Sequence, residues 1–198
     1  MSIRTYFENI ADALRQKTGT QNTYTPEEMP DAIINIPSGG SIDLTNIKII
    51  GLLCSKKRSA ITTGYTQVGS LRLSDGSNYF NFTNISGRSA SELGGYTTNS
   101  NEFAANVFNN STANKGILNL YNNPSKFGWF IYIPTPVDCT TYNMWEWWTA
   151  NDASDRDPVS FALYLSDGEH IVILDEQTDY DVTTSRNSLA YSGSIIGG

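Results

Sequence analysis

The chain has 198 residues, a formal net charge of −7 and only 17% charged residues. This length is enough for one domain of ordinary size with a small appendage. An acidic, sparsely charged chain is a poor binder of nucleic acid or of an anionic membrane, because both require clustered lysine and arginine. No segment approaches the roughly 18 consecutive apolar residues of a membrane-spanning helix. We therefore expect neither nucleic acid nor a membrane as a partner.

Residues 1–36 have the pattern of two amphipathic helices. One apolar stripe consists of Ile3, Phe7, Ile10 and Leu14, and the other consists of Met29, Ile33 and Ile36. Thr25 is suited to cap the second helix, with Pro26 at its first position. The pattern predicts a small helical hairpin. Because so short a unit buries little core, it must pack on the rest of the chain, on copies of itself or on a host assembly.

The segment NIADALRQKTGTQNTYTPEEMPDAIINI resembles a short module of bacteriophage tail, fibre and other virion structural proteins. The resemblance implies that residues 1–36 anchor or oligomerise the chain among other virion proteins, and we expect a homo-oligomer, with a trimer favoured. The alternative is an ordinary amphipathic hairpin. The N-terminus lacks a basic segment followed by an apolar run, so we expect no signal peptide. The resemblance implies synthesis in the host cytoplasm and a place on the phage particle.

Residues 37–41, Pro-Ser-Gly-Gly-Ser, form a flexible linker that separates this hairpin from a second domain at 42–198. Strand patterns cover residues 47–53, 64–73, 127–133 and 142–149, with a turn at 74–77. Residues 84–101 and 109–116 are rich in Asn, Ser, Thr and Gly and are expected to be loops. Many short strands separated by turn signals predict an all-β sandwich.

Residues suited to catalysis are scarce. His170 is the only histidine, with no cysteine nearby, so the sequence offers no zinc site. Cys54 and Cys139 lie in apolar runs and are expected to be buried free thiols, although the two could pair. There is no phosphate loop or nucleophile elbow, and we expect a protein that is not an enzyme. The basic run at 56–58 is expected to be a solvated edge.

Tryptophans are more informative. Trp129 alternates with apolar neighbours and is expected in the core. In the run MWEWWT, Trp145 and Trp147 share one strand face while Trp148 takes the other, so at least one ring is expected near the surface. An exposed tryptophan beside a polar loop is suited to stacking on a sugar ring. The alternative is a core tryptophan.

The loop at 150–158 holds three aspartates and one arginine. Its Asn and Asp side chains can cap backbone amides, and Arg156 can bridge carboxylates bidentately, which predicts a self-contained turn network. A direct ligand role for Asn151 and Arg156 is the alternative. Alternating apolar residues at 161–165, a Ser-Asp-Gly turn at 166–168 and an apolar run at 171–174 predict a β-hairpin.

The stretch from Trp148 to Gln177, with its Thr-Ala-Asn-Asp, Arg-Asp-Pro, Ser-Asp-Gly and Leu-Asp elements, resembles the signature of discoidin-like domains. These are also called galactose-binding-like or coagulation-factor C-type domains. The resemblance covers roughly residues 85–195. It implies an antiparallel jelly-roll β-sandwich that binds carbohydrate. The glycan contacts that we expect are Trp148, Asn151, Asp155, Arg156 and Tyr96.

A second stretch, AANVFNNST at 104–112, resembles the loop that holds a structural calcium in many of these domains. The resemblance implies Phe108, Asn109 and Thr112 as ligands. Asn109 stands where the family usually has Asp, and this loss of a formal negative charge weakens calcium binding. No other cofactor is expected.

Together these patterns predict a bacteriophage virion structural protein, in the tail, the fibre or the head. Its outward-facing carbohydrate-binding domain would attach the particle to a host-surface glycan. The alternative is a purely structural decoration or assembly protein that uses its sandwich for protein contacts.

Overall fold

A computed structural model of the chain describes residues 42–59, 64–97, 99, 101–120 and 124–196. The chain divides into two compact units, residues 1–41 and 42–198. The helical hairpin predicted for residues 1–36 and the linker at 37–41 lie outside the described residues.

The described residues are mainly β. The strands are β1 (Ile47–Lys57), β2 (Gly64–Val68), β3 (Ser70–Ser74), β4 (Ser89–Leu93), β5 (Gly95–Tyr96), β6 (Gly116–Leu120), β7 (Phe127–Val137), β8 (Met144–Trp148), β9 (Pro158–Ser166), β10 (Ile171–Gln177) and β11 (Leu189–Ser194). Three short 3₁₀ segments join them: η1 (Phe82–Asn84), η2 (Ala104–Phe108) and η3 (Ser154–Arg156).

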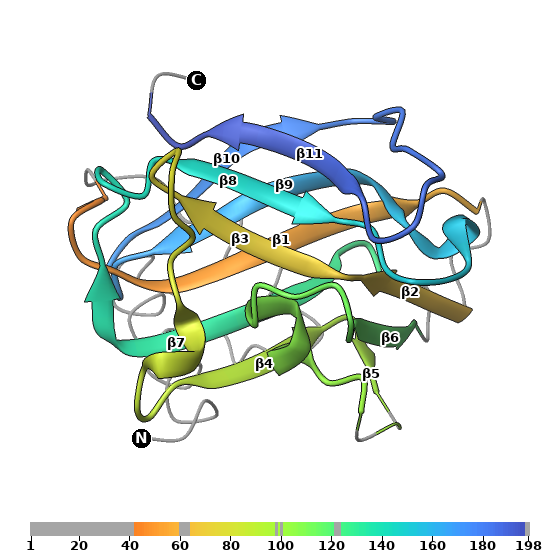
Figure 1. The fold of residues 1–198 in the computed structure, drawn as a ribbon, viewed down its shortest axis with the longest axis horizontal. Coiled ribbons are helices and arrows are strands. Elements are labelled where there is room, and N and C mark those ends of the chain that lie inside the picture. The colour runs from red at the N-terminus through yellow and green to blue at the C-terminus, as the bar shows by residue number, and fades with distance from the viewer. Residues whose placement is uncertain (1–41, 60–63, 98, 100, 121–123, 197–198) are drawn as a thin grey trace, which may run out of the picture. The chain divides into compact units, whose positions relative to one another are not determined.

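The strands form three antiparallel sheets. The largest has the order β10-β9-β1-β7-β4, and two three-stranded sheets have the orders β11-β8-β3 and β2-β6-β5. Figure 1 shows β11, β8 and β3 lying across β10, β9 and β1. The expected mainly β, antiparallel and sandwich-like architecture is confirmed at this level of detail.

One continuous core lies between these sheets. The Trp147 ring is 5.3 Å from the Phe161 ring and the Trp145 ring is 6.3 Å from it, which joins β8 of one sheet to β9 of the other. Trp145 and Trp147 are fully buried while Trp148 is half-buried on the opposite face, as the alternation of side chains predicts. The expected core face of β7 is also confirmed, with Trp129 fully buried.

The five-stranded sheet is apolar on its outer face as well. Phe130, Gly51 and Tyr164 are directly opposite one another on β7, β1 and β9, so their side chains share this face. Phe130 is 9% exposed and Tyr164 is 6% exposed, with ring centroids 5.2 Å apart. A Cβ at Gly51 would lie 2.2 Å from Cδ1 of Phe130, so only glycine leaves room for the ring. Ile49 and Leu53 are buried on the same face.

Gly69 divides the pattern at 64–73 into two strands. Its N–H donates to the carbonyl of Trp148 at 2.9 Å, and a Cβ there would lie 2.5 Å from the Thr149 oxygen. The chain passes here from the β2-β6-β5 sheet to the β11-β8-β3 sheet. A single alternating run in the sequence therefore serves two sheets.

The hairpin at 161–174 is confirmed as β9 and β10, and Asp167 Oδ1 accepts from the turn amides of Glu169 and His170.

The prediction of a loop at 84–101 is wrong in part, because this segment contains β4 and β5. β4 is an edge strand with the polar sequence SASEL, which carries little of the apolar alternation by which strands are recognised.

Candidate ligand-binding site

A buried ion pair fixes the loop that precedes β9. Arg186 reaches Asp157 with both arms of its guanidinium, Nη1 to Oδ1 at 3.0 Å and Nη2 to Oδ2 at 2.6 Å. The Asp157 side chain is fully buried. Burial raises the pKa of the Asp157 carboxyl, and Arg186 opposes this rise. Nη1 of Arg186 also donates to the carbonyl of Asp152, so one guanidinium holds both ends of the loop.

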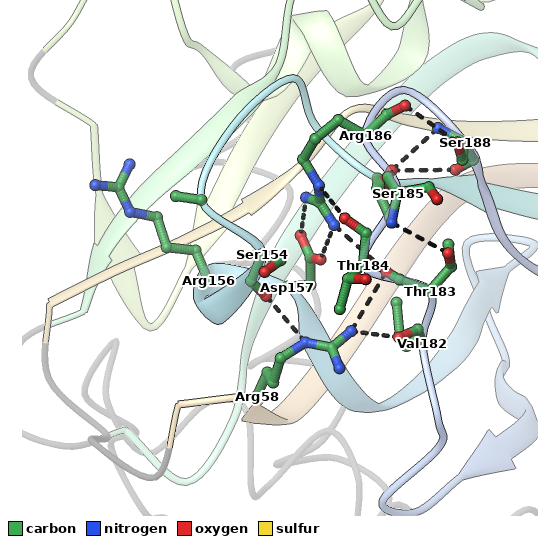
Figure 2. Close-up of polar contacts among 12 residues, drawn as sticks. Arg58, Ser154, Arg156, Asp157, Val182, Thr183, Thr184, Ser185, Arg186 and Ser188 are labelled. Atoms are coloured by element: carbon green, nitrogen blue, oxygen red, sulfur yellow. Dashed lines mark hydrogen bonds and ion pairs between the residues drawn. The ribbon is translucent and has the colours of Figure 1, made fainter.

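A second arginine ties the same loop to the chain before β11. Arg58 Nε donates to the Ser154 carbonyl at 3.1 Å, and its Nη2 donates to the carbonyls of Val182 and Thr183 (Figure 2). The expectation that residues 56–58 form a solvated edge is therefore wrong for Arg58. It is also wrong for Lys57, which is buried with Nζ 3.0 Å from the Tyr65 carbonyl oxygen. Arg58 and Arg186 are far apart in sequence, and no local pattern predicts that both bind the same loop.

Arg156 takes no part in this network. Figure 2 shows its side chain pointing away from Asp157, Arg58 and Arg186. Its Nη1 is 3.9 Å from Oδ2 of Asp152, which is too long for a hydrogen bond. Both Asp152 oxygens are instead 2.8 Å from Nζ of the buried Lys115. The bidentate bridge predicted for Arg156 is made by Arg186.

Two polar side chains of β2 donate hydrogen bonds to backbone carbonyls of the loop before β9. Thr66 Oγ1 donates to the Arg156 carbonyl at 2.9 Å. Gln67 Nε2 donates to the carbonyls of Asp152 and Ala153. Ala153 has a φ of 39°, a left-handed conformation that a non-glycine residue adopts only at some cost. The backbone that carries Arg156 is therefore fixed relative to β2.

Two tyrosines and an asparagine form an outward row across the β2-β6-β5 sheet, which we call the tyrosine row. Tyr65 on β2 and Tyr96 on β5 both pair with Asn119 on β6, so the three side chains share a face. Tyr65 is 44% exposed and Tyr96 is 45% exposed. Asn119 Nδ2 donates to the Tyr96 hydroxyl at 3.3 Å. Arg156 lies at the Tyr65 end, with Cζ 5.4 Å from the ring centroid.

Trp148 lies on another sheet, with one side of its ring already covered. The Arg72 guanidinium is 4.4 Å from the Trp148 ring centroid and 5.0 Å from that of Tyr79. Glu146 Oε2 accepts from Trp148 Nε1 at 3.1 Å and from the Tyr79 hydroxyl at 2.9 Å. This cluster satisfies its own polar groups, and the Trp148 ring is half-buried.

Among the glycan contacts that the sequence predicts, the structure therefore groups Arg156 and Tyr96 on one face. Asn151 and Asp155 are exposed on the loop beside Arg156. Sequence reasoning missed Tyr65 and Asn119. Their place in the row depends on strand register, which the separate strand patterns do not reveal.

The loop expected to hold calcium begins with η2. Asn109 Oδ1 accepts from the Ser111 amide at 2.9 Å, and Phe108 is buried. The oxygens of Phe108, Asn109 and Thr112 carry no formal charge, and residues 104–112 contain no carboxylate. This donor set does not fit a calcium site of useful affinity. Across the part of the chain that the structure describes, no group of three or more His, Cys, Asp or Glu could hold a metal ion.

Cys54 and Cys139 are both buried and free, so the buried thiols predicted from sequence are confirmed. Burial, helped by Asp138, raises the pKa of the Cys139 thiol to about 12. His170 Nδ1 lies 3.2 Å from Oδ2 of Asp167 at the β9–β10 turn.

Within the described ranges, no helix has the length and apolarity needed to cross a bilayer. Comparison of the chain with protein-family models, with curated proteins and with solved structures found no match.

Proposed function

We propose that residues 42–198 form a carbohydrate-binding domain, without enzymatic activity, that attaches a bacteriophage particle to a glycan of the host surface. The observation that carries the proposal is the outward tyrosine row beside Arg156. Aromatic faces stack on the apolar faces of sugar rings, while amide and guanidinium groups hydrogen-bond to hydroxyls. Tyr65, Asn119, Tyr96 and Arg156 place these groups side by side on one exposed face.

The finer assignment is a galactose-binding-like jelly-roll carried by a tail, fibre or head protein. Its support is the likeness of residues 148–177 to discoidin-like domains and of residues 1–36 to virion modules. In this proposal residues 1–36 attach the chain to other virion proteins and assemble it as a trimer. Copies on one particle would turn weak binding by a single site into firm attachment through multivalency.

The alternative is a decoration or assembly protein of the particle. The observation that favours it is the tyrosine row itself, in which the Tyr65 and Tyr96 rings are exposed. Tyrosine is enriched at protein interfaces.

A glycan array probed with the full chain separates the two functions. We expect the wild type to bind, and we expect Tyr96→Ala and Arg156→Ala to weaken binding. Tyr79→Ala is the matched control, because Tyr79 is an exposed tyrosine outside the row. Wild-type protein that binds neither the array nor host cells would rule out the attachment role. Sedimentation of the full chain then tests assembly, for which we expect a trimer.

A further inference from the structure

We propose that the tyrosine row binds a linear, negatively charged glycan, with at least two sugar units across β2, β6 and β5 and an acidic group at Arg156. This inference rests on the proposed function and names its ligand class. The acidic group is a carboxylate or a phosphate, since a guanidinium recognises both in the same bidentate manner.

The spacing of the tyrosines indicates a linear ligand. Tyr65 and Tyr96 are on the two outer strands of the β2-β6-β5 sheet, so their backbones are about 10 Å apart, twice the spacing of neighbouring strands. One ring cannot cover both aromatic side chains at that separation. Asn119 lies between them and can hydrogen-bond to the chain that joins the two stacked units.

The Arg156 guanidinium has N–H donors that no described hydrogen bond uses. The side chain is 32% exposed, and its nearest carboxylate among the described ion pairs is Asp152 at 3.9 Å. Lys115 already neutralises Asp152 through two contacts of 2.8 Å. A guanidinium whose five N–H donors make no hydrogen bond among the described residues is suited to an anionic group of a ligand.

The other described charges at this end of the row are Lys57 and Lys115 on one side and Asp152, Asp155 and Glu102 on the other. Lys57 is buried against the Tyr65 carbonyl. Its pKa is lowered, first by burial and also by Arg156, while the nearby Asp155 opposes this shift. Lys57 therefore offsets Asp155, and Lys115 is shared between Asp152 and Glu102, whose Oε1 is 3.5 Å from its Nζ. Because the whole chain has a net charge of −7, general attraction cannot hold an anion, and the attraction must be local.

The site is also preorganised. The Thr66 hydroxyl holds the Arg156 carbonyl, and Thr66 is the immediate neighbour of Tyr65 on β2. Gln67 holds the next part of the loop through Asp152 and Ala153. The backbones of Arg156 and Tyr65 are thus fixed to one strand, which lowers the entropy that binding must overcome.

Calorimetry on the full chain tests the inference with three sets of probes of matched lengths: uronic-acid oligosaccharides, sugar-phosphate oligomers and neutral oligosaccharides. We expect tighter binding of one anionic set, with affinity rising from one sugar unit to two or three. The anionic set that binds more tightly, uronic acids or sugar phosphates, shows whether the recognised group is a carboxylate or a phosphate. Raising the salt concentration should weaken anionic binding only.

The variants locate the site. Arg156→Ala should reduce affinity for the anionic probe by roughly tenfold or more, since hydrogen bonds to charged groups are among the stronger ones. Arg156→Lys should restore part of it. Tyr65→Ala and Tyr96→Ala should each weaken binding of the longer oligomers. The control Arg88→Ala removes an exposed arginine that bonds only to nearby carbonyls among its described partners, and should change nothing.

Failures of the two ideas are distinguishable. Equal affinity for neutral and anionic probes, or full affinity in Arg156→Ala, overturns the anionic inference while leaving the carbohydrate-binding function standing. Equal affinity for one and three sugar units overturns the linear site. Absence of binding to every probe and to host cells overturns the proposed function itself.

Discussion

Arg186 and Asp157 form a bidentate pair in which the carboxylate is fully buried, with N–O distances of 3.0 and 2.6 Å. The pair joins the segment before β11 to the loop before β9. Removal of one partner from such a pair is costly, because it leaves the other charge in a medium that solvates it poorly.

Arg186→Ala should therefore lower the free energy of unfolding by about 3 kcal/mol. Urea unfolding followed by tryptophan fluorescence measures the change. Arg156→Ala is the control and should shift stability by less than about 1 kcal/mol, because its ion pair is long and partly exposed. Equal losses in the two variants would contradict the roles assigned to these arginines.

The destabilisation by Arg186→Ala should depend on pH. Burial already raises the pKa of Asp157 above its usual value, and loss of the opposing Arg186 raises it further. The folded variant then binds a proton more tightly than the unfolded chain, whose carboxyl has a pKa of about 3.9. The difference in stability from wild type should thus be largest near neutral pH and shrink as the pH falls through the raised pKa. A difference that stays constant from about pH 7 to pH 4 would contradict this account.

Gly51→Ala should destabilise the five-stranded sheet by about 1–3 kcal/mol, because its Cβ would overlap the Phe130 ring. Phe130→Ala alone should cost about 3 kcal/mol through lost packing with Tyr164. In the double variant the overlap disappears, so the combined loss should be smaller than the sum. Chemical unfolding of the four proteins completes the cycle, and strict additivity would be the contrary result.

Tyr191 should make the protein sensitive to alkali. Burial, followed by the hydrogen bond to the Asp175 carboxylate, raises its pKa above the usual value. The unfolded chain loses the tyrosyl proton near pH 10 while the folded protein keeps it, so stability should fall as the pH rises above about 10. Tyr191→Phe lacks this proton and should decline less steeply between about pH 9 and pH 11.5. Parallel declines in urea titrations would refute the assignment.

Calcium should contribute little to stability. The loop at 104–112 lacks a carboxylate, and its Asn109 side chain already caps the Ser111 amide. We expect the melting temperature to be unchanged between a chelator and about 1 mM calcium, because a site of weak affinity adds little free energy at that concentration. A rise of several degrees would establish a site that the donor chemistry does not suggest.

Local sequence patterns predict the features that depend only on residues close together in the chain. The β9–β10 hairpin follows from alternation and a Ser-Asp-Gly turn, and the inward placement of Trp145 and Trp147 follows from strand periodicity. The sequence predicts Arg156 as the bridging arginine because it is adjacent to the loop aspartates, whereas Arg186, which makes the bridge, reaches the loop only through the fold. Whether residues of different strands meet depends on register, which no single segment encodes.

The candidate site depends on strand register in the same way. The sequence predicts Arg156 and Tyr96 as separate candidates, and only the pairing of β2, β6 and β5 reveals the row that connects them. Alternation predicts that Trp148 points outward, but it does not predict that Arg72 lies over one side of the ring through the pairing of β3 with β8. Outward orientation is readable from alternation, whereas what covers an outward side chain is not.

The two apolar faces of the five-stranded sheet should leave a mark on tolerance to substitution. Every residue of β9 is buried, as are most residues of β1. A half-solvated strand tolerates polar residues at every second position, since one face meets water. In a saturation-mutagenesis profile, β1 and β9 should instead reject polar replacements at consecutive positions, as strands of a parallel sheet covered on both sides do, while β11 should keep the alternating profile.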